Sequence, residues 1–239
     1  MRSLVLAVVI VGFLFLSFLV MRSIYKVKIN KALFNFFIAI SLIVTSLVAI
    51  PATAKATISP TIVIFGDSLS AAYGISQHEG WVALLQQRLT QKKYNYKVVN
   101  ASISGETTSG GLSRFADMLM TQKPNIVLIE LGGNDGLRGL SAVNTYNNLD
   151  AMIQQANVKK AKVMLLGMKI PPNYGLKYSR QFSDNYQHLA KKYNIKFVPF
   201  FLEGVAGKPD LIQADGLHPT AQAQAKMLEN VWPILAKMF

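Results

Sequence analysis

The sequence contains no cysteine among its 239 residues. This absence excludes disulfide bonds, thiolate metal sites and a cysteine nucleophile, and it also excludes a lipid attached to an N-terminal cysteine. It does not argue against export, because a domain of this size buries enough apolar surface to be stable without disulfides.

Acidic residues are also scarce, with 12 Asp and Glu against 25 Lys and Arg. Residues 1–54 contain five basic and no acidic residues, so the remainder carries 20 basic and 12 acidic residues and a net charge of +8. This excess indicates solubility first and affinity for anionic lipid surfaces second, which makes a peripheral membrane contact a candidate interaction. No nucleic-acid partner is expected, because the basic residues are scattered singly along polar helix faces and no known binding motif is present.

Histidine occurs only three times. His78 lies in a polar loop and His188 in a helical stretch, and both are expected to be solvated. His218 differs because Asp215, three residues earlier, can accept a hydrogen bond from one ring nitrogen and leave the other as a base. No third ligand with suitable spacing accompanies this pair, so no metal is expected, and no cofactor either.

Two long apolar runs, 3–21 and 32–54, form an N-terminal targeting region at 1–54. Basic residues, an apolar stretch and the small-x-small sequence at 52–54 predict a signal peptide over about 21–54. The extra run at 3–21 is either a transmembrane helix or the result of an upstream start codon, with Met21 as the true start. Both alternatives place the basic segment 22–31 in the cytoplasm and export residues 57–239. We expect a periplasmic or secreted protein, and the alternative is an uncleaved anchor on the outer face of the inner membrane.

Strand-like and helix-like segments alternate from residue 57 to the end. Nearly continuous apolar runs, as in strands buried on both faces, occur at 61–65, 96–100, 125–131, 162–168 and 196–200. Segments with helical periodicity lie between or after them at 80–91, 109–121, 143–157, 179–193 and 219–237. Five such repeats predict an α/β fold, a three-layer sandwich around a five-stranded parallel sheet, with the ligand site at the carboxyl ends of the strands.

Polar residues follow three of the predicted strands. Ser68 comes after the first strand, where free N–H groups favour negative charge, although the Asp67-Ser68 pair could also be a simple helix cap. Gly105 follows the second strand and can bring a backbone N–H close to a substrate, and Asn134 follows the third and can donate a side-chain N–H. Tight turns are the alternative for both glycine-rich stretches, and neither has the sequence of a phosphate-binding loop.

The order of these residues resembles the SGNH or GDSL hydrolase family. The matching blocks are Phe65-Gly66-Asp67-Ser68-Leu69-Ser70, Gly105, Gly132-Gly133-Asn134-Asp135 and Asp215-Gly216-Leu217-His218-Pro219. The resemblance runs from about residue 58 to 234. Within the family it is strongest to the bacterial periplasmic enzymes that act as acyl-CoA thioesterase, protease and lysophospholipase.

The resemblance implies a flavodoxin-like SGNH fold and an acyl-enzyme mechanism. Ser68 would be the nucleophile, activated by His218 and Asp215, and the N–H groups of Ser68, Gly105 and Asn134 would bind the oxyanion. Asp135–Leu140 resembles the family's mobile switch loop. Leu137, Pro172 and Tyr174, with Pro171, resemble its substrate wall.

The expected substrates are small-molecule acyl esters and thioesters such as lysophospholipids, acyl-CoA and aryl esters. The alternatives are a carbohydrate or peptidoglycan O-acetyl esterase of the same superfamily and, less favoured, a binding module without activity. A monomer is expected.

Overall fold

The computed structural model describes residues 16–17, 20, 24, 30–31 and 59–239. The chain divides into two units, Met1–Thr57 and Ile58–Phe239, and the second is described here. The predicted apolar runs and signal peptide lie, apart from six isolated positions, outside the described residues. Within the described residues, no helix has both the length and the apolar character needed to cross a bilayer.

Five parallel strands form the central sheet of the second unit. Their order is β2-β1-β3-β4-β5, the flavodoxin-like order, so the α/β prediction is confirmed. The strands are β1 (Thr61–Gly66), β2 (Lys97–Asn100), β3 (Ile126–Glu130), β4 (Lys162–Leu166) and β5 (Lys196–Val198). β3 is buried along its whole length, which explains its unbroken apolar sequence.

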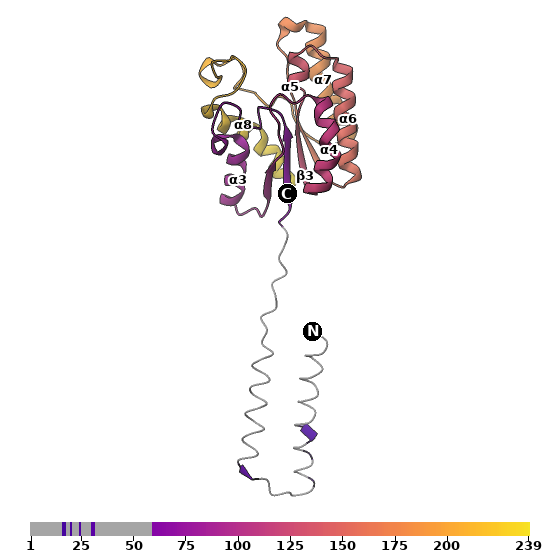
Figure 1. Ribbon diagram of the computed structural model, residues 1–239, viewed down its shortest axis with the longest axis vertical. Helices are drawn as coiled ribbons and strands as arrows, with labels where there is room; N and C mark the ends of the chain where they lie inside the picture. The colour runs from indigo at the N-terminus through magenta and orange to yellow at the C-terminus, as the bar shows by residue number, and fades with distance from the viewer. Residues whose placement is uncertain (1–15, 18–19, 21–23, 25–29, 32–58) are drawn as a thin grey trace. The chain divides into compact units, whose positions relative to one another are not determined.

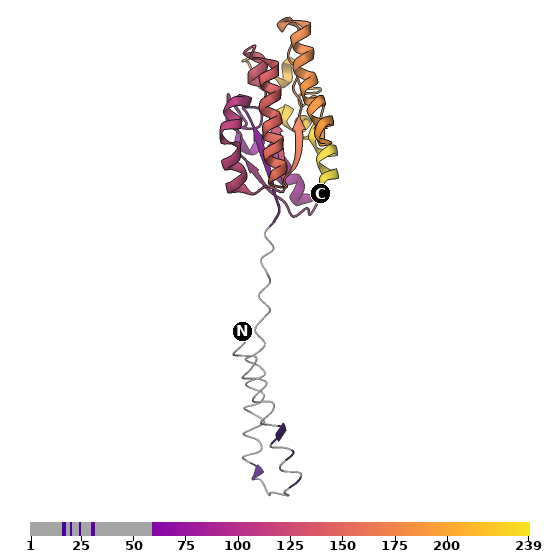
Figure 2. The same cartoon turned by 90° about the vertical axis from the view of Figure 1, so that its right-hand side faces the viewer.

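Helices cover both faces of the sheet. Figure 1 shows α3 (Trp81–Gln91) and α8 (Ala221–Leu235) on one side, where they contact each other. On the other side α4 (Thr108–Gln122), α6 (Ala142–Val158) and α7 (Leu176–Tyr193) lie side by side, as the turned view in Figure 2 shows. The buried apolar side chains of the described residues all lie between Ile62 and Met238, so this unit has its own core.

The short helix α5 (Gly133–Leu137) was not expected from the sequence, which predicted a loop at 135–140. Its Asp135 is buried and accepts hydrogen bonds from the backbone N–H and the hydroxyl of Thr108, at the start of α4. These bonds order the segment after β3. Short 3-10 turns complete the fold at Gln77–Glu79, Pro172–Tyr174, Pro209–Leu211 and Ala236–Met238.

The other boundaries agree with the sequence to within a few residues. β4 ends at Leu166, two residues before the expected end, and α7 begins at Leu176, three residues earlier than expected. The loops that follow β1, β2, β3 and β5 converge at the carboxyl edge of the sheet, where a parallel α/β fold binds its ligands.

Candidate active site

Ser68 lies two residues beyond β1 and is almost buried. Gly66 ends the strand at a position where no side chain fits, because a Cβ atom there would lie 2.5 Å from Glu130 Oε2. The chain then turns, and Ser68 Oγ lies 2.8 Å from His218 Nε2. A serine hydroxyl and an imidazole separated by 150 residues in the sequence are therefore in hydrogen-bond contact.

Asp215 fixes the orientation of His218. One carboxylate oxygen accepts the backbone N–H groups of Leu217 and His218 at 2.9 and 3.0 Å, and the other lies 2.6 Å from His218 Nδ1. Hydrogen bonds from the backbone N–H groups of His218 and Leu217, and then from the His218 side chain, lower the pKa of Asp215 to about 2. An ionised carboxylate can only accept, so Nδ1 carries the proton and Nε2 faces Ser68 as a base.

Two residues that sequence reasoning missed hold the histidine loop in place. The ring of Tyr73 lies against His218, with 4.4 Å between the centroids. Gln213 donates from its amide to the backbone carbonyls of Tyr73 and Pro219, and its backbone N–H bonds to the carbonyl of His218 at 2.7 Å. Gln213 therefore links the loop after β1 to the loop before α8. Nothing in the sequence marks it, because its contact with Tyr73 joins segments 140 residues apart.

The predicted oxyanion donors come from three loops at the same edge. The backbone N–H groups of Ser68 and Gly105 make no hydrogen bond to any described residue. Asn134 Nδ2 donates to Asp67 Oδ2 at 3.1 Å and to the carbonyl of Glu106 at 3.0 Å. Gly105 has a φ of +77°, a conformation that favours glycine, and its carbonyl accepts a bond from Arg138 Nη2 at 3.1 Å.

A pair of buried carboxyl groups lies beneath the serine, and sequence reasoning missed it as well. Glu130 is fully buried, and one of its oxygens accepts the hydroxyl of Ser70 at 2.6 Å and the backbone N–H of Asp67 at 3.3 Å. Burial, followed by the charge of Asp67, raises the pKa of Glu130 well above its ordinary value. Burial also raises the pKa of Asp67 to about 6, although the N–H of Leu69 and the amide of Asn134 lower it. Both carboxyl groups of the pair therefore hold a proton more tightly than a free carboxyl group does.

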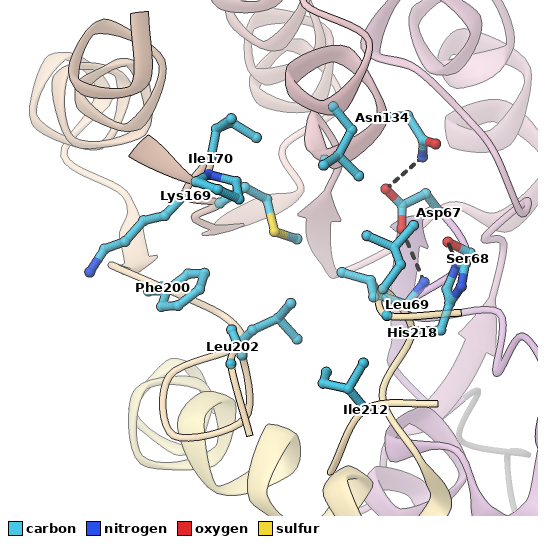
Figure 3. Close-up of a pocket in the computed structure, with 18 residues that line it drawn as sticks. Asp67, Ser68, Leu69, Asn134, Lys169, Ile170, Phe200, Leu202, Ile212 and His218 are labelled. Carbon is cyan, nitrogen blue, oxygen red and sulfur yellow. Dashed lines mark hydrogen bonds between the residues drawn. The ribbon is translucent and has the colours of Figure 1, made fainter. Parts of the chain in front are cut away.

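A cavity of about 210 Å³ opens beside Ser68 (Figure 3). Asn134 and His218 lie at its catalytic end together with Ser68. Most of the remaining wall is apolar, from Leu69, Leu137, Met168, Ile170, Pro171, Phe200, Leu202, Ala206, Ile212 and Leu217. Lys169 also lines the cavity.

The predicted substrate wall is only partly found at this cavity. Leu137 lines it, as does Pro171. Tyr174 does not line it but donates its hydroxyl to the carbonyl of Leu137 at 3.1 Å, so it supports the wall from outside. The side chain of Pro172 is outside the described part of the chain. Gly105 does not line the cavity either. Its carbonyl accepts a hydrogen bond from Arg138, and the carbonyl of the next residue, Glu106, accepts one from Asn134.

The described residues contain no group of three or more His, Asp or Glu side chains that could hold a metal ion. The site itself supplies a hydroxyl, an oriented base, several N–H donors and an apolar cavity. This combination suits acyl transfer to Ser68.

Comparison with known proteins places the chain in a family. Residues 64–226 match the model of the GDSL-like lipase/acylhydrolase family. The esterase TesA of Pseudomonas aeruginosa is 48% identical over 195 residues, covering 82% of this chain and 97% of that protein. The chain belongs to the GDSL-like lipase/acylhydrolase family. This confirms the resemblance seen in the sequence and the predicted class of activity, ester hydrolysis.

Further relatives agree with this assignment. The thioesterase 1/protease 1/lysophospholipase L1 of Escherichia coli K12 is 42% identical over 172 residues, covering 72% of this chain and 81% of that protein. A crystal structure of TesA superposes with a TM-score of 0.73 at 51% identity, covering 75% of this chain and 99% of the solved chain. The esterase EstA from Pseudoalteromonas gives a TM-score of 0.71 at 42% identity, with 74% and 97% covered.

The buried pair predicts an unusual pH dependence of stability. The folded chain keeps a proton on Glu130 that the unfolded chain releases above the ordinary pKa of 4.5. The unfolding free energy should therefore fall as pH rises from 4.5 toward the folded pKa, by up to roughly 1.4 kcal/mol per pH unit. Glu130→Gln keeps the shape and should make this slope above pH 4.5 shallower in urea-unfolding measurements, and the remaining slope belongs in part to Asp67, whose pKa is also raised.

The exposed Asp184 provides a matched control, because Asp184→Asn removes a carboxyl group that makes no hydrogen bond. Asp184→Asn should keep the slope of the wild type. A slope in Glu130→Gln equal to that of the wild type would show that Glu130 is ionised in the folded chain.

Proposed function

We propose that this protein hydrolyses acyl esters and thioesters through an acyl-enzyme on Ser68. The observation that carries the proposal is the chain of contacts from Ser68 Oγ to His218 Nε2 at 2.8 Å and from His218 Nδ1 to Asp215 at 2.6 Å. A serine, a base and a carboxylate in this order form the arrangement that activates a hydroxyl for attack on a carbonyl carbon.

The reaction follows from the positions of these groups. As Ser68 Oγ attacks the acyl carbon, its proton passes to His218 Nε2, and the carbonyl oxygen becomes an oxyanion. Collapse of this intermediate breaks the bond to the leaving alcohol or thiol, which takes the proton from His218. Water then repeats the sequence on the acyl-enzyme and releases the carboxylic acid, restoring Ser68 and His218.

The oxyanion is proposed to bind the backbone N–H groups of Ser68 and Gly105 and the amide of Asn134. The two backbone groups are unpaired and therefore ready to donate. Both N–H bonds of Asn134 already have acceptors, Asp67 and Glu106. An oxyanion would have to share one of these donors, so the charge of Asp67 bears directly on how strongly Asn134 can bind it.

The substrate proposal rests on the apolar cavity next to Ser68. Leu137, Ile170, Phe200 and Leu202 suit an acyl chain and offer a sugar few hydrogen bonds. Relatives named as arylesterase and as thioesterase/lysophospholipase agree with this choice. The O-acetyl esterase alternative would require a small polar pocket instead.

We further propose that the enzyme acts outside the cytoplasmic membrane, as a periplasmic or secreted monomer. The support is the order of basic, apolar and small residues over about 21–54. Apart from three positions, this segment lies outside the described part of the chain. An uncleaved anchor on the outer face of the inner membrane is the alternative.

Removing the nucleophile should abolish turnover. Ser68→Ala should lower kcat by about 10⁶-fold, since the other groups cannot act on the carbonyl alone. His218→Ala should have a similar effect. The measurement is p-nitrophenyl ester hydrolysis, together with mass-spectrometric mapping of a fluorophosphonate label. Ser183→Ala in α7 is the control and should keep full activity, and a label on any serine other than Ser68 would refute the assignment.

Removing the side-chain oxyanion donor should affect the chemical step. Asn134→Ala should lower kcat about 10²–10³-fold with little change in KM, because the interaction forms with the charge that develops on the oxygen. Asn147→Ala on the exposed side of α6 should leave both constants unchanged. A raised KM with kcat unchanged would instead make Asn134 a residue that binds the ground state.

Acyl-chain preference tests the cavity. From acetate to octanoate, kcat/KM should rise by about fourfold per methylene buried, equivalent to ~0.8 kcal/mol each. Leu137→Ala should reduce this rise and spare acetate, whereas Leu176→Ala, outside the cavity, should not. The highest kcat/KM on acetate would favour the O-acetyl esterase.

A further inference from the structure

The edge of the sheet opposite the candidate active site is basic. Lys97, Lys162 and Lys196 are the first residues of β2, β4 and β5, and all three are exposed. The sheet is parallel, and its register places these residues at its amino edge. Three of the five strands therefore begin with a lysine at the same end of the domain.

The helices that precede these strands end at the same edge, and they end in lysines too. Lys192 at the end of α7 forms an ion pair with Asp150 and is left out of the set. The other exposed lysines at the ends of α3, α4, α6 and α7 are Lys92, Lys93, Lys123, Lys159, Lys160 and Lys191. The connections from these helices to the next strands, 92–96, 123–125, 159–161 and 194–195, contain no Asp or Glu. This set of nine lysines is called the basic edge below.

Favourable interaction with helix dipoles explains only part of this arrangement. A cation in the last turn of a helix is stabilised by the partial negative charge of the unpaired carbonyls. That effect accounts for the six helix-end lysines but not for the three at strand starts, which belong to no helix.

Aromatic residues lie beside the lysines. The ring of Phe239 lies 4.6 Å from that of Tyr94, 4.8 Å from that of Tyr96 and 6.1 Å from that of Trp232, measured between centroids. Lys92 Nζ lies 6.0 Å from the centre of the Trp232 ring. Tyr94 is 38% exposed, and Val158, next to Lys159, is 78% exposed. Tryptophan and tyrosine with flanking lysines are the residues found where proteins meet a membrane surface.

We propose that the basic edge binds the surface of a membrane containing anionic phospholipids. Charge complementarity and the adjacent aromatic rings favour this partner. β1 also begins at this edge, at Thr61. Nucleic acid is the less favoured partner, because the edge has lysines instead of the arginines that form bidentate contacts with phosphates and bases.

This orientation directs the candidate active site away from the lipid. β1 alone spans six residues, or about 20 Å, and Ser68 lies beyond its far end. A docked enzyme would therefore take its ester from the aqueous phase and not from within the bilayer. The docking surface is separate from the proposed ester-cleaving site, so binding and catalysis can be tested independently.

The test uses residues 58–239, which have their own core. These residues correspond in extent to the solved TesA chain, because the superposition covers 75% of this chain and 99% of the solved one. The protein is mixed with phosphatidylcholine vesicles containing about 30 mol% phosphatidylglycerol, and the bound fraction is measured by flotation. Binding should be undetectable on pure phosphatidylcholine and should be lost at about 1 M salt, where the Debye length is about 3 Å.

Two charge-matched variants locate the contact. Lys123→Gln/Lys159→Gln/Lys160→Gln removes three cations from the basic edge. Lys177→Gln/Lys208→Gln/Lys226→Gln removes three exposed cations near the opposite edge and near the start of α8. Each lysine near an anionic surface contributes about fivefold to the affinity for vesicles. The first variant should therefore bind vesicles at least tenfold more weakly, and the affinity of the second should change by less than about twofold. Near-UV circular dichroism checks that both variants are folded.

Trp232 reports the contact directly. It is half-buried at the basic edge, whereas Trp81, the chain's other tryptophan, is fully buried. Vesicle binding should shift the fluorescence to shorter wavelength, and Trp232→Phe should remove that shift. Hydrolysis of a soluble p-nitrophenyl ester should continue unchanged on the bound enzyme.

Equal weakening of binding in the two triple variants would overturn the proposal, as would absence of binding to anionic vesicles. Tighter binding to a duplex DNA than to the vesicles, lost in the first variant, would reassign the edge to nucleic acid. Vesicle binding that blocks hydrolysis would place the contact at the cavity instead. Inactivity on every ester, with vesicle binding retained, would refute the proposed function alone.

Discussion

The parallel register of β1 on β3 is the constraint on which the candidate site depends. It pairs Gly66 with Glu130, and the glycine leaves room for the buried carboxyl group. Glu130 then accepts the backbone N–H of Asp67, and Asp67 in turn accepts the amide of Asn134. A slip of one residue would reverse the faces of these side chains and separate the serine loop from the asparagine loop.

The pKa values of three carboxyl groups in one site are shifted differently because their surroundings differ. Asp215 is partly exposed and accepts several N–H groups, so it stays ionised and orients His218. Glu130 is fully buried, and this burial, followed by the charge of Asp67, raises its pKa well above the ordinary value. Asp67, between these extremes, is hydrogen-bonded to Asn134. Its charge therefore connects the buried core to the proposed oxyanion site.

The polarity of a parallel sheet keeps the candidate active site and the proposed membrane-binding edge apart. Every strand ends at one edge, where the serine, asparagine and histidine loops meet around the apolar cavity. Every strand begins at the other edge, where lysines and aromatic rings gather. The common direction of the strands brings distant loops together at the candidate active site. It also brings lysines together at the basic edge, about 20 Å or more away.

The sequence by itself predicted the α/β class, the five strands and, through its resemblance to the family, the candidate triad Ser68, Asp215 and His218. Unbroken apolar runs and helical periodicity are local properties, and the Asp215 to His218 contact lies within three residues. Gln213, Tyr73 and Glu130 could not be found in this way, since each acts through contacts with segments far along the chain. The lysines looked scattered along the sequence, and only the tertiary structure showed that they share one edge. The physical reason is the common direction of the strands in a parallel sheet. It brings the helix ends and strand starts of successive strand–helix repeats to one edge, and sequence spacing alone does not reveal this.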